Sequence, residues 1–373
     1  MRPLYPDEFD VSIANRIRAH RIRDPRLTAP GGVAILLGMA RIAAEDQTWI
    51  QAPTEDLSYF SFGWLLVFIP LFVTPSLTPA VILVVLLFNY VHRHYTFVLI
   101  YGEPEEFARH RQAYVLLPLI ALAVTFLSVA LNAFPLLLTI SVLWTILHSV
   151  AQKYGLTRVY ARKAGYGDRW IEKGVIYSWF YVAFFGVAES ERGALAEYTS
   201  GQVILSYVGA HLDWMTLASH VALLVALGFT ALYLRQEWRH RVRISIAKNL
   251  YVGSILLLYA VFFYSLVVGY IVFAFSHALE YIAFVNLFVA QKYRKRPGVT
   301  SFLARAVRRQ RLTSATFAGL VIGLSLIARA YDEDAFAVYI AGSSFLHFIY
   351  DAMIWKVRRP EVGEPLGIRY TPA

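Results

Sequence analysis

The sequence predicts an all-α integral membrane protein, a polytopic bundle of about ten transmembrane helices with both termini in the cytoplasm. Three observations predict this class. Of the 373 residues, 58% are hydrophobic and only 16% are charged, whereas a soluble domain carries roughly a quarter charged residues. The apolar residues lie in runs of about 20, the length that crosses the hydrocarbon core of a bilayer. Lysine and arginine gather in every second connection between these runs.

Ten apolar runs are predicted to be spans. In chain order they are 57–76, 78–101, 113–132, 134–155, 173–189, 214–234, 249–267, 268–290, 314–331 and 335–356. Short turns join the first span to the second (TPSLTP) and the third to the fourth (NAFP). The seventh and eighth spans, and the ninth and tenth, are joined as briefly. Because turns this short can join only neighbouring helices that run in opposite directions, we expect these pairs to be antiparallel hairpins.

The predicted orientation depends on where the basic residues lie. Five segments hold 25 of the 35 lysines and arginines: 102–112, 153–173, 235–248, 291–312 and 356–373. The intervening connections hold almost none. The positive-inside rule therefore places these segments and both termini in the cytoplasm, and we expect a bacterial inner (cytoplasmic) membrane location.

The chain then divides into three parts. Residues 1–56 form a cytoplasmic or interfacial segment, in which the apolar stretch 31–43 is too short to span and is expected to lie at the interface. Residues 57–356 form the transmembrane domain, and 357–373 a cytoplasmic tail. The chain has no cysteine, which excludes disulfides, iron–sulfur clusters and thiolate metal sites.

Five of the ten histidines fall inside predicted spans. They are His92, His94, His148, His277 and His347. All lie in even-numbered spans, which run in the same direction. Each precedes the cytoplasmic end of its span by about 7 to 14 residues, or on the order of 10–20 Å. The five imidazoles can therefore occupy one layer in the inner half of the bilayer, where ionisable groups are costly and normally face the bundle interior.

Three of these histidines are followed by a carboxylate or amide one turn later. Glu280 follows His277 by three residues, Asp351 follows His347 by four, and Gln152 follows His148 by four. Such offsets put both side chains on one helix face. This is how a metal ligand and a group that orients it are arranged.

The stretch NYVHRHY departs from this pattern. Residues two apart on a helix point about 200° apart, so His92 and His94 cannot both face one ion from a regular helix. Either one of them faces elsewhere or the helix is locally distorted. The predicted ligand set retains both.

Imidazole and carboxylate donors suit iron, manganese, copper or zinc. We expect non-haem iron, with another transition metal or haem b as alternatives. In this hypothesis the five histidines supply ligands, and Glu280 and Asp351 ligate or orient an imidazole. Gln152 donates to a ligand, and Tyr281 donates a hydrogen bond to bound oxygen or substrate. A proton-coupled transporter without a metal is the competing class, since His–Glu and His–Asp pairs can relay protons. A haem-binding electron-transfer subunit is the third.

In architecture the chain resembles the membrane histidine-rich oxygenases, namely fatty-acid desaturases and hydroxylases, alkane monooxygenases and carotene-cleaving dioxygenases. The likeness lies in the placement of the five intramembrane histidines, because the boxes HxxxH and HxxHH and the signature HGxxD do not occur. The resemblance implies a non-haem iron oxygenase, desaturase or hydroxylase acting on a lipid or isoprenoid-like substrate. The expected partners are the bilayer, that substrate and an electron donor, with no nucleic acid.

Overall fold

The computed structural model describes residues 48–190, 197, 202–203, 206, 213–294, 298 and 301–368. The chain divides into two compact units, Met1–Thr48 and Trp49–Ala373, and the second contains nearly all of the described residues. The predicted interfacial stretch at 31–43 lies outside them.

Every regular element in the described ranges is a helix, in agreement with the predicted all-α class. In order these are α3 (Pro53–Glu55), η2 (Asp56–Ser61), α4 (Leu65–Val73), η3 (Pro75–Leu77), α5 (Thr78–Tyr101), α6 (Pro104–Arg109), α7 (Arg111–Ala130), α8 (Phe134–Ala164), α9 (Arg169–Ser190), α12 (Asp213–Arg239), η5 (Arg241–Arg243), α13 (Ile246–Tyr264), α14 (Leu266–Arg294), α15 (Phe302–Val307), α16 (Gln310–Tyr331), α17 (Glu333–Ile354) and α18 (Pro360–Gly363).

Eight helices in the described part are long and apolar enough to cross a membrane. They are α5 together with η3, then α7, α8, α12, α13, α14, α16 and α17. Each overlaps one of the predicted spans. This content suggests a membrane protein, although the predicted number of ten spans is not reached.

Two predicted spans differ from expectation. The run at 57–76 is broken into Pro53–Ser61 and Leu65–Val73, which are bent by 55°. The break contains Gly63, where a Cβ atom would lie 2.5 Å from the Ser58 backbone oxygen and 2.4 Å from Leu279 Cδ2 of α14, so close packing requires a glycine there. Counting the bent pair as one span gives nine. The run at 173–189 forms α9, whose lysine, tyrosines and tryptophan lower its hydropathy, and it is not among the eight.

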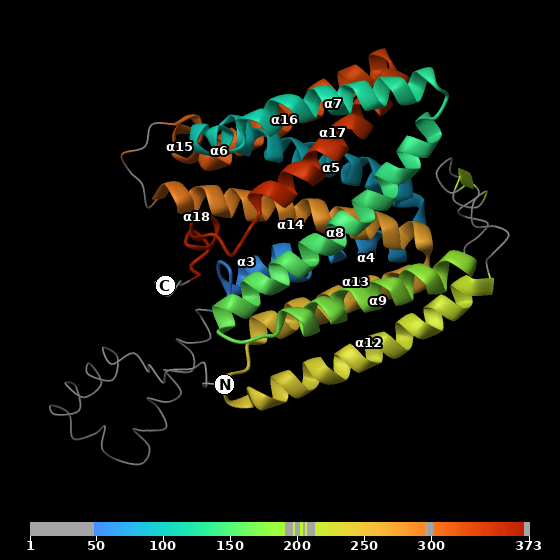
Figure 1. Cartoon of the computed structure of the whole chain (residues 1–373), viewed down its shortest axis with the longest axis vertical. Coiled ribbons are helices and arrows are strands. Elements are labelled where there is room, and N and C mark those ends of the chain that lie inside the picture. Colours follow the sequence, from blue (N-terminus) through green and yellow to red (C-terminus); the bar gives the residue numbers. More distant parts are fainter. Residues whose placement is uncertain are drawn as a thin grey trace. The chain divides into compact units, whose positions relative to one another are not determined.

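Helix α14 lies at the centre of the bundle. It packs against α5 and α13, while α13 packs against α9, which in turn contacts α12. Figure 1 shows α14 between α5, α16 and α17 on one side and α13, α9 and α12 on the other. In the most apolar stretch of α14, 56% of the residues are buried, against 11% in α7, α12 and α16. A site carried by α14 is therefore inside the bundle.

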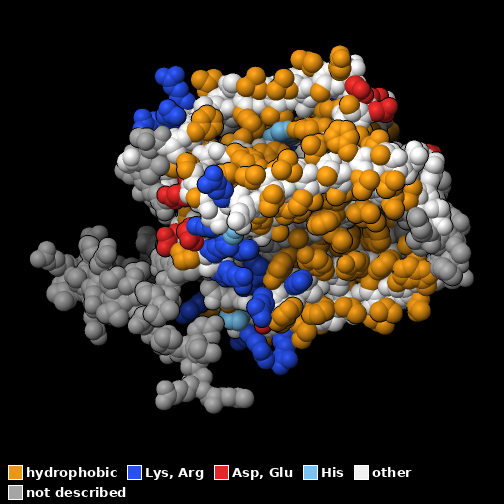
Figure 2. All heavy atoms as spheres, turned by 45° about the horizontal axis from the view of Figure 1, so that its top comes forward, with side chains coloured by type: hydrophobic (Ala, Val, Ile, Leu, Met, Phe, Trp, Pro, Cys, Tyr) orange, Lys and Arg blue, Asp and Glu red, His pale blue; other side chains and the backbone are white. Residues whose placement is uncertain are grey.

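The outer faces of the peripheral helices are apolar. Leu119 of α7, Leu224 of α12 and Ile327 of α16 are 59%, 71% and 67% exposed. Figure 2 shows hydrophobic side chains over broad areas of the surface, with lysines and arginines gathered toward one end of the helices. Exposed apolar area of this extent is unusual for a soluble monomer and fits contact with lipid tails.

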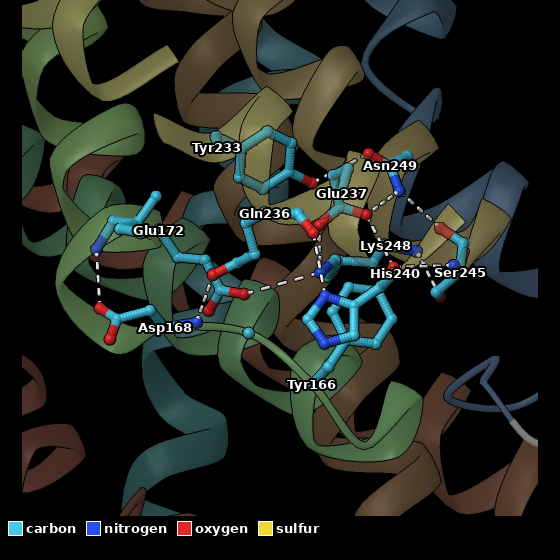
Figure 3. Close-up of polar contacts among 12 residues, drawn as sticks. Tyr166, Asp168, Glu172, Tyr233, Gln236, Glu237, His240, Ser245, Lys248 and Asn249 are labelled. Atoms are coloured by element: carbon cyan, nitrogen blue, oxygen red, sulfur yellow. Dashed lines mark hydrogen bonds and ion pairs between the residues drawn. The ribbon is translucent and has the colours of Figure 1, made fainter. Parts of the chain in front are cut away.

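A buried polar network ties α9, α12 and α13 together (Figure 3). The Lys248 Nζ atom at the start of α13 lies 2.6 Å from Glu237 Oε1 of α12 and 3.8 Å from Glu172 Oε1 of α9. It also lies 3.7 Å from the centre of the Tyr166 ring, on the α8–α9 connection. Lys248 is fully buried. Glu172 also forms an ion pair with Arg158 of α8. Because a buried charge is costly unless paired, these ion pairs hold α8, α9, α12 and α13 together.

The connection between α8 and α9 is shaped to fit this network. The Tyr166 hydroxyl donates to Glu237 Oε2 over 2.7 Å and accepts from the Ser245 backbone N–H over 2.9 Å. Burial, together with the hydrogen bond to Glu237, raises the pKa of Tyr166, so the phenol stays protonated. Gly167 has φ +134°, and a Cβ there would lie 2.1 Å from Glu172 Oε1. Only glycine fits at this position.

Candidate metal centre

Four histidines from four helices meet inside the bundle. They are His92 of α5, His148 of α8, His277 of α14 and His347 of α17. The His92 ring centroid lies 4.8 Å from that of His277 and 4.9 Å from that of His347. The His148 centroid lies 5.2 Å from that of His277 and 4.9 Å from that of His347. The fold thus brings together imidazoles from segments far apart in the sequence.

Most of the nitrogens in these rings have no hydrogen-bond partner. His92 Nδ1, His148 Nε2 and His347 Nε2 are buried without one, and so are both nitrogens of His277. Leaving a buried polar atom unsatisfied costs about 1–3 kcal/mol. Five such atoms in one place therefore indicate that something other than the protein satisfies them.

The donor atoms are spaced closely enough to share an ion. Two groups have their donor atoms within 4.8 Å of one another: His92, His277 and His347, and His148, His347 and Asp351. Atoms bound to one ion through bonds of about 2.0–2.2 Å lie at most about 4.4 Å apart. Small side-chain shifts would bring either group to bonding distance.

The His347 ring is oriented by a threonine on α5. Thr96 Oγ1 lies 2.7 Å from His347 Nδ1 and 2.9 Å from Asp351 Oδ1. Thr96 Oγ1 also lies 2.6 Å from the Tyr281 hydroxyl. A hydroxyl has one proton and a carboxylate is only an acceptor, so when Thr96 donates to Asp351, His347 Nδ1 donates to Thr96. That tautomer leaves His347 Nε2 as a free electron-pair donor facing the other rings. A second hydrogen bond that fixes the tautomer in this way is typical of metal-bound histidine.

Asp351 presents one oxygen to its supports and the other to the imidazoles. Its Oδ1 accepts from Thr96 and, over 2.7 Å, from the Tyr281 hydroxyl. Its Oδ2 lies 3.4 Å from His148 Nε2 and 3.7 Å from His347 Nε2. Trp355 Nε1 donates to the Tyr281 hydroxyl over 3.3 Å. Tyr281 therefore positions Asp351 in this structure. The predicted hydrogen bond from Tyr281 to oxygen or substrate stays a prediction.

Glu280 faces away from the imidazoles. It forms a fully buried ion pair with Lys153 of α8 and accepts hydrogen bonds from Ser276 and Gln152, over 3.1 and 3.2 Å. Gln152 Nε2 also donates to the His277 backbone carbonyl over 3.1 Å. Glu280 belongs to neither donor group, and its charge is paired with that of Lys153. We therefore leave Glu280 out of the proposed ligand set.

His94 also lies apart from the cluster. Its ring contacts the Tyr90 backbone carbonyl over 2.6 Å and the Tyr339 hydroxyl, and it is in neither donor group. Helix α5 is regular from Thr78 to Tyr101, so residues two apart face different directions. His92 faces the cluster and His94 does not.

An elongated cavity of about 230 Å³ adjoins the cluster. His148, Asp351 and Tyr281 line it, and most of its other lining side chains are apolar. Small-molecule binding sites are typically apolar pockets in which a few polar groups converge at one place.

Two polar side chains at this centre were not identified from the sequence. Thr96 follows His92 by four residues, so its place on the same face of α5 was a readable signal. Lys153 was assigned to a basic cytoplasmic connection, yet it is the first charged residue after His148 within one continuous helix and is fully buried. Its partnership with Glu280 depends on how α8 packs on α14.

Comparison with protein-family models, with curated protein sequences and with solved structures gave no match. The metal-binding role of these residues therefore stays a prediction that rests on the geometry alone.

Proposed function

We propose that the chain is a metal-dependent integral-membrane enzyme. In this proposal His92, His148, His277, His347 and Asp351 hold one transition-metal ion. The observation that supports it is the convergence, from four helices, of four imidazoles that each have at least one buried ring nitrogen without a hydrogen-bond partner. These residues fit the group: all are donors that first-row transition metals accept, and Thr96 leaves His347 Nε2 free to bind.

A single ion is favoured over two. The two donor groups share His347, whose Nδ1 atom is engaged by Thr96. Only Nε2 remains, and one imidazole nitrogen binds one ion. The two groups therefore describe overlapping parts of one centre.

We propose non-haem iron as the ion, because two or more imidazoles with a carboxylate are typical of sites that use it. Haem b is less favoured, since four rings with neighbouring centroids 4.8–5.2 Å apart leave no room for a porphyrin between them. Bound iron would supply the activation of dioxygen, and an electron donor would then be required. The reaction class is oxygenation, desaturation or hydroxylation of a lipid or isoprenoid-like substrate, which the apolar cavity beside Asp351 supports.

The residues of the chain would orient and shield this centre. Thr96 and Tyr281 hold Asp351 through its Oδ1 atom, so that Oδ2 faces the imidazoles. His92, His277 and His347 are 4%, 0% and 1% exposed, which excludes bulk water from one side of the site. Low water access limits side reactions of reactive intermediates.

We also propose that both termini are cytoplasmic and that the membrane is a bacterial inner membrane. The support is the distribution of charge, because basic residues occupy the last turns of α8, α12 and α14. The cluster would then lie in the cytoplasmic half of the bilayer.

The test is elemental analysis of the purified protein in detergent. We expect about one iron per chain, without haem absorbance, and loss of iron in His148→Ala, His277→Ala and His347→Ala. His94→Ala is the matched control, because it removes an intramembrane imidazole outside the cluster and should keep the iron. Iron retained in all of the cluster variants would refute the proposal.

The same measurement addresses the proton-coupled transporter. The buried Lys153–Glu280 pair beside His277 is the observation that favours it, because paired intramembrane charges can carry protons. Wild-type protein without any metal, combined with pH-dependent flux into liposomes, would support the transporter and contradict the enzyme.

A further inference from the structure

One face of α8 forms a wall of the cavity beside the cluster. Its lining residues are His148, Ala151, Gln152, Gly155, Leu156 and Val159. Their spacing of three and four residues places them on a single helix face. From the first to the last, α8 rises about 16 Å. The cavity therefore runs along three turns of α8, away from the imidazoles and toward the basic end of that helix.

The cavity is a channel that is partly open along its side. Phe284 of α14 and Ala352 of α17 line its other walls, and Ala151 and Ala352 are exposed. Its length along α8, about 16 Å, accommodates an extended segment of a hydrocarbon chain.

The polar groups are confined to the end next to the cluster. His148, Gln152, Tyr281 and Asp351 lie there, and no lysine or arginine is among the described residues that line the cavity. A carboxylate or phosphate placed in the channel would have no cationic partner, and an unpaired buried charge is strongly disfavoured. The segment of a ligand that occupies the channel is therefore uncharged.

We propose that this channel is the substrate-binding site and that it takes an uncharged hydrocarbon chain. The chain lies along α8, with the carbon atoms to be transformed next to His148 and Asp351. The proposal rests on the proposed function for the chemistry at that end, whereas the binding of the chain depends only on the channel.

Gly155 offers a direct way to close the channel. A Cβ atom at Gly155 would meet no atom within 4 Å, although the residue is in the middle of the lining face. A larger side chain there projects into open space instead of into packed neighbours. Gly155→Leu should therefore fill the channel and leave the helices in place.

The experiment uses full-length protein in detergent and an alkyl diazirine, an unbranched chain that cross-links on illumination. Labelled peptides are mapped by mass spectrometry, and iron is measured on the same samples. In wild-type protein we expect label at Leu156, Val159 or Phe284. Gly155→Leu should reduce this label at least tenfold, and Gly155→Ala should reduce it less, because it adds one methyl group.

Gly323→Leu of α16 is the control, because its Cβ also meets no atom within 4 Å and it does not line the channel. It should label like the wild type. Iron retained in Gly155→Leu shows that the variant folds. The proposal would be overturned if the wild-type protein carried no label on the residues that line the channel, or if Gly155→Leu carried as much label there as the wild type. Channel label in a wild-type protein that holds no metal would support the binding site while refuting the proposed enzyme.

Discussion

Thr96→Val should weaken metal binding without disturbing the fold. Valine matches threonine in shape but removes the hydroxyl that lies 2.7 Å from His347 Nδ1 and 2.9 Å from Asp351 Oδ1. Thr96 is fully buried, so water cannot replace the lost oxygen. His347 Nδ1 is then left without an acceptor, and the ring no longer has a preferred tautomer.

The expected loss of metal affinity in Thr96→Val depends on the hydrogen bonds that His347 and Asp351 keep. Asp351 keeps its hydrogen bond from Tyr281, at 2.7 Å, so one of its two supports survives. His347 loses its only hydrogen bond at Nδ1 and must offer Nε2 from a mixture of tautomers. Loss of one such supporting contact typically costs 10–100-fold in metal affinity, which corresponds to about 1.4–2.8 kcal/mol.

The assay is competition between the metal-depleted protein and a chelator of known affinity, read as the dissociation constant for iron. Thr96→Ser keeps the hydroxyl and should stay within about threefold of the wild type, since a change of that size is under 1 kcal/mol. Thr139→Val is the matched control, because this buried hydroxyl bonds only the Pro135 carbonyl of its own helix, over 2.8 Å. If Thr96→Val bound iron as tightly as Thr139→Val, the assigned role of Thr96 and the proposed orientation of His347 would both be wrong.

Two further predictions concern the bundle and its orientation. Lys248→Met leaves the buried Glu237 without its cation, while Glu172 keeps Arg158. The change should destabilise the protein by about 3–5 kcal/mol, seen as a lower midpoint of thermal unfolding in detergent. Lys173→Met, at an exposed position, should stay within about 0.5 kcal/mol, and equal midpoints for the two variants would contradict the role given to Lys248. Because the chain has no cysteine, single substitutions report topology: in intact cells a membrane-impermeant thiol reagent should label Asp334→Cys but not Arg308→Cys. The reverse labelling would invert the proposed orientation.

Hydropathy was sufficient to locate most of the bundle. The run predicted at 78–101 coincides with α5, and the run at 335–356 lies within two residues of α17 at both ends, because the length of an apolar run directly reflects the span. Hydropathy did not predict the bend in the first predicted span. At the break, Leu279 of α14, more than 200 residues later, packs against Gly63, and the local sequence pattern does not show this contact.

The site shows the same division between local and long-range information. The four-residue spacing of His347 and Asp351 predicts that they share a face of α17. In the structure the His347 imidazole and the Asp351 carboxylate both lie at the cluster. The same reasoning paired His277 with Glu280, yet Glu280 faces Lys153 instead. Spacing shows which side chains share a helix face. It does not show which neighbour that face meets, because the rotation of each helix is set by tertiary packing.

The donors of the cluster are spread from His92 to Asp351, across almost the whole length of the helical unit. During synthesis, α5, α8 and α14 leave the ribosome well before α17, which carries both His347 and Asp351. A nascent chain that stops short of α17 has three imidazoles and no carboxylate to complete the set. If the cluster holds the proposed ion, its full set of ligands forms only after the final long helix has entered the membrane, and the bound ion would then link the early helices to the late one.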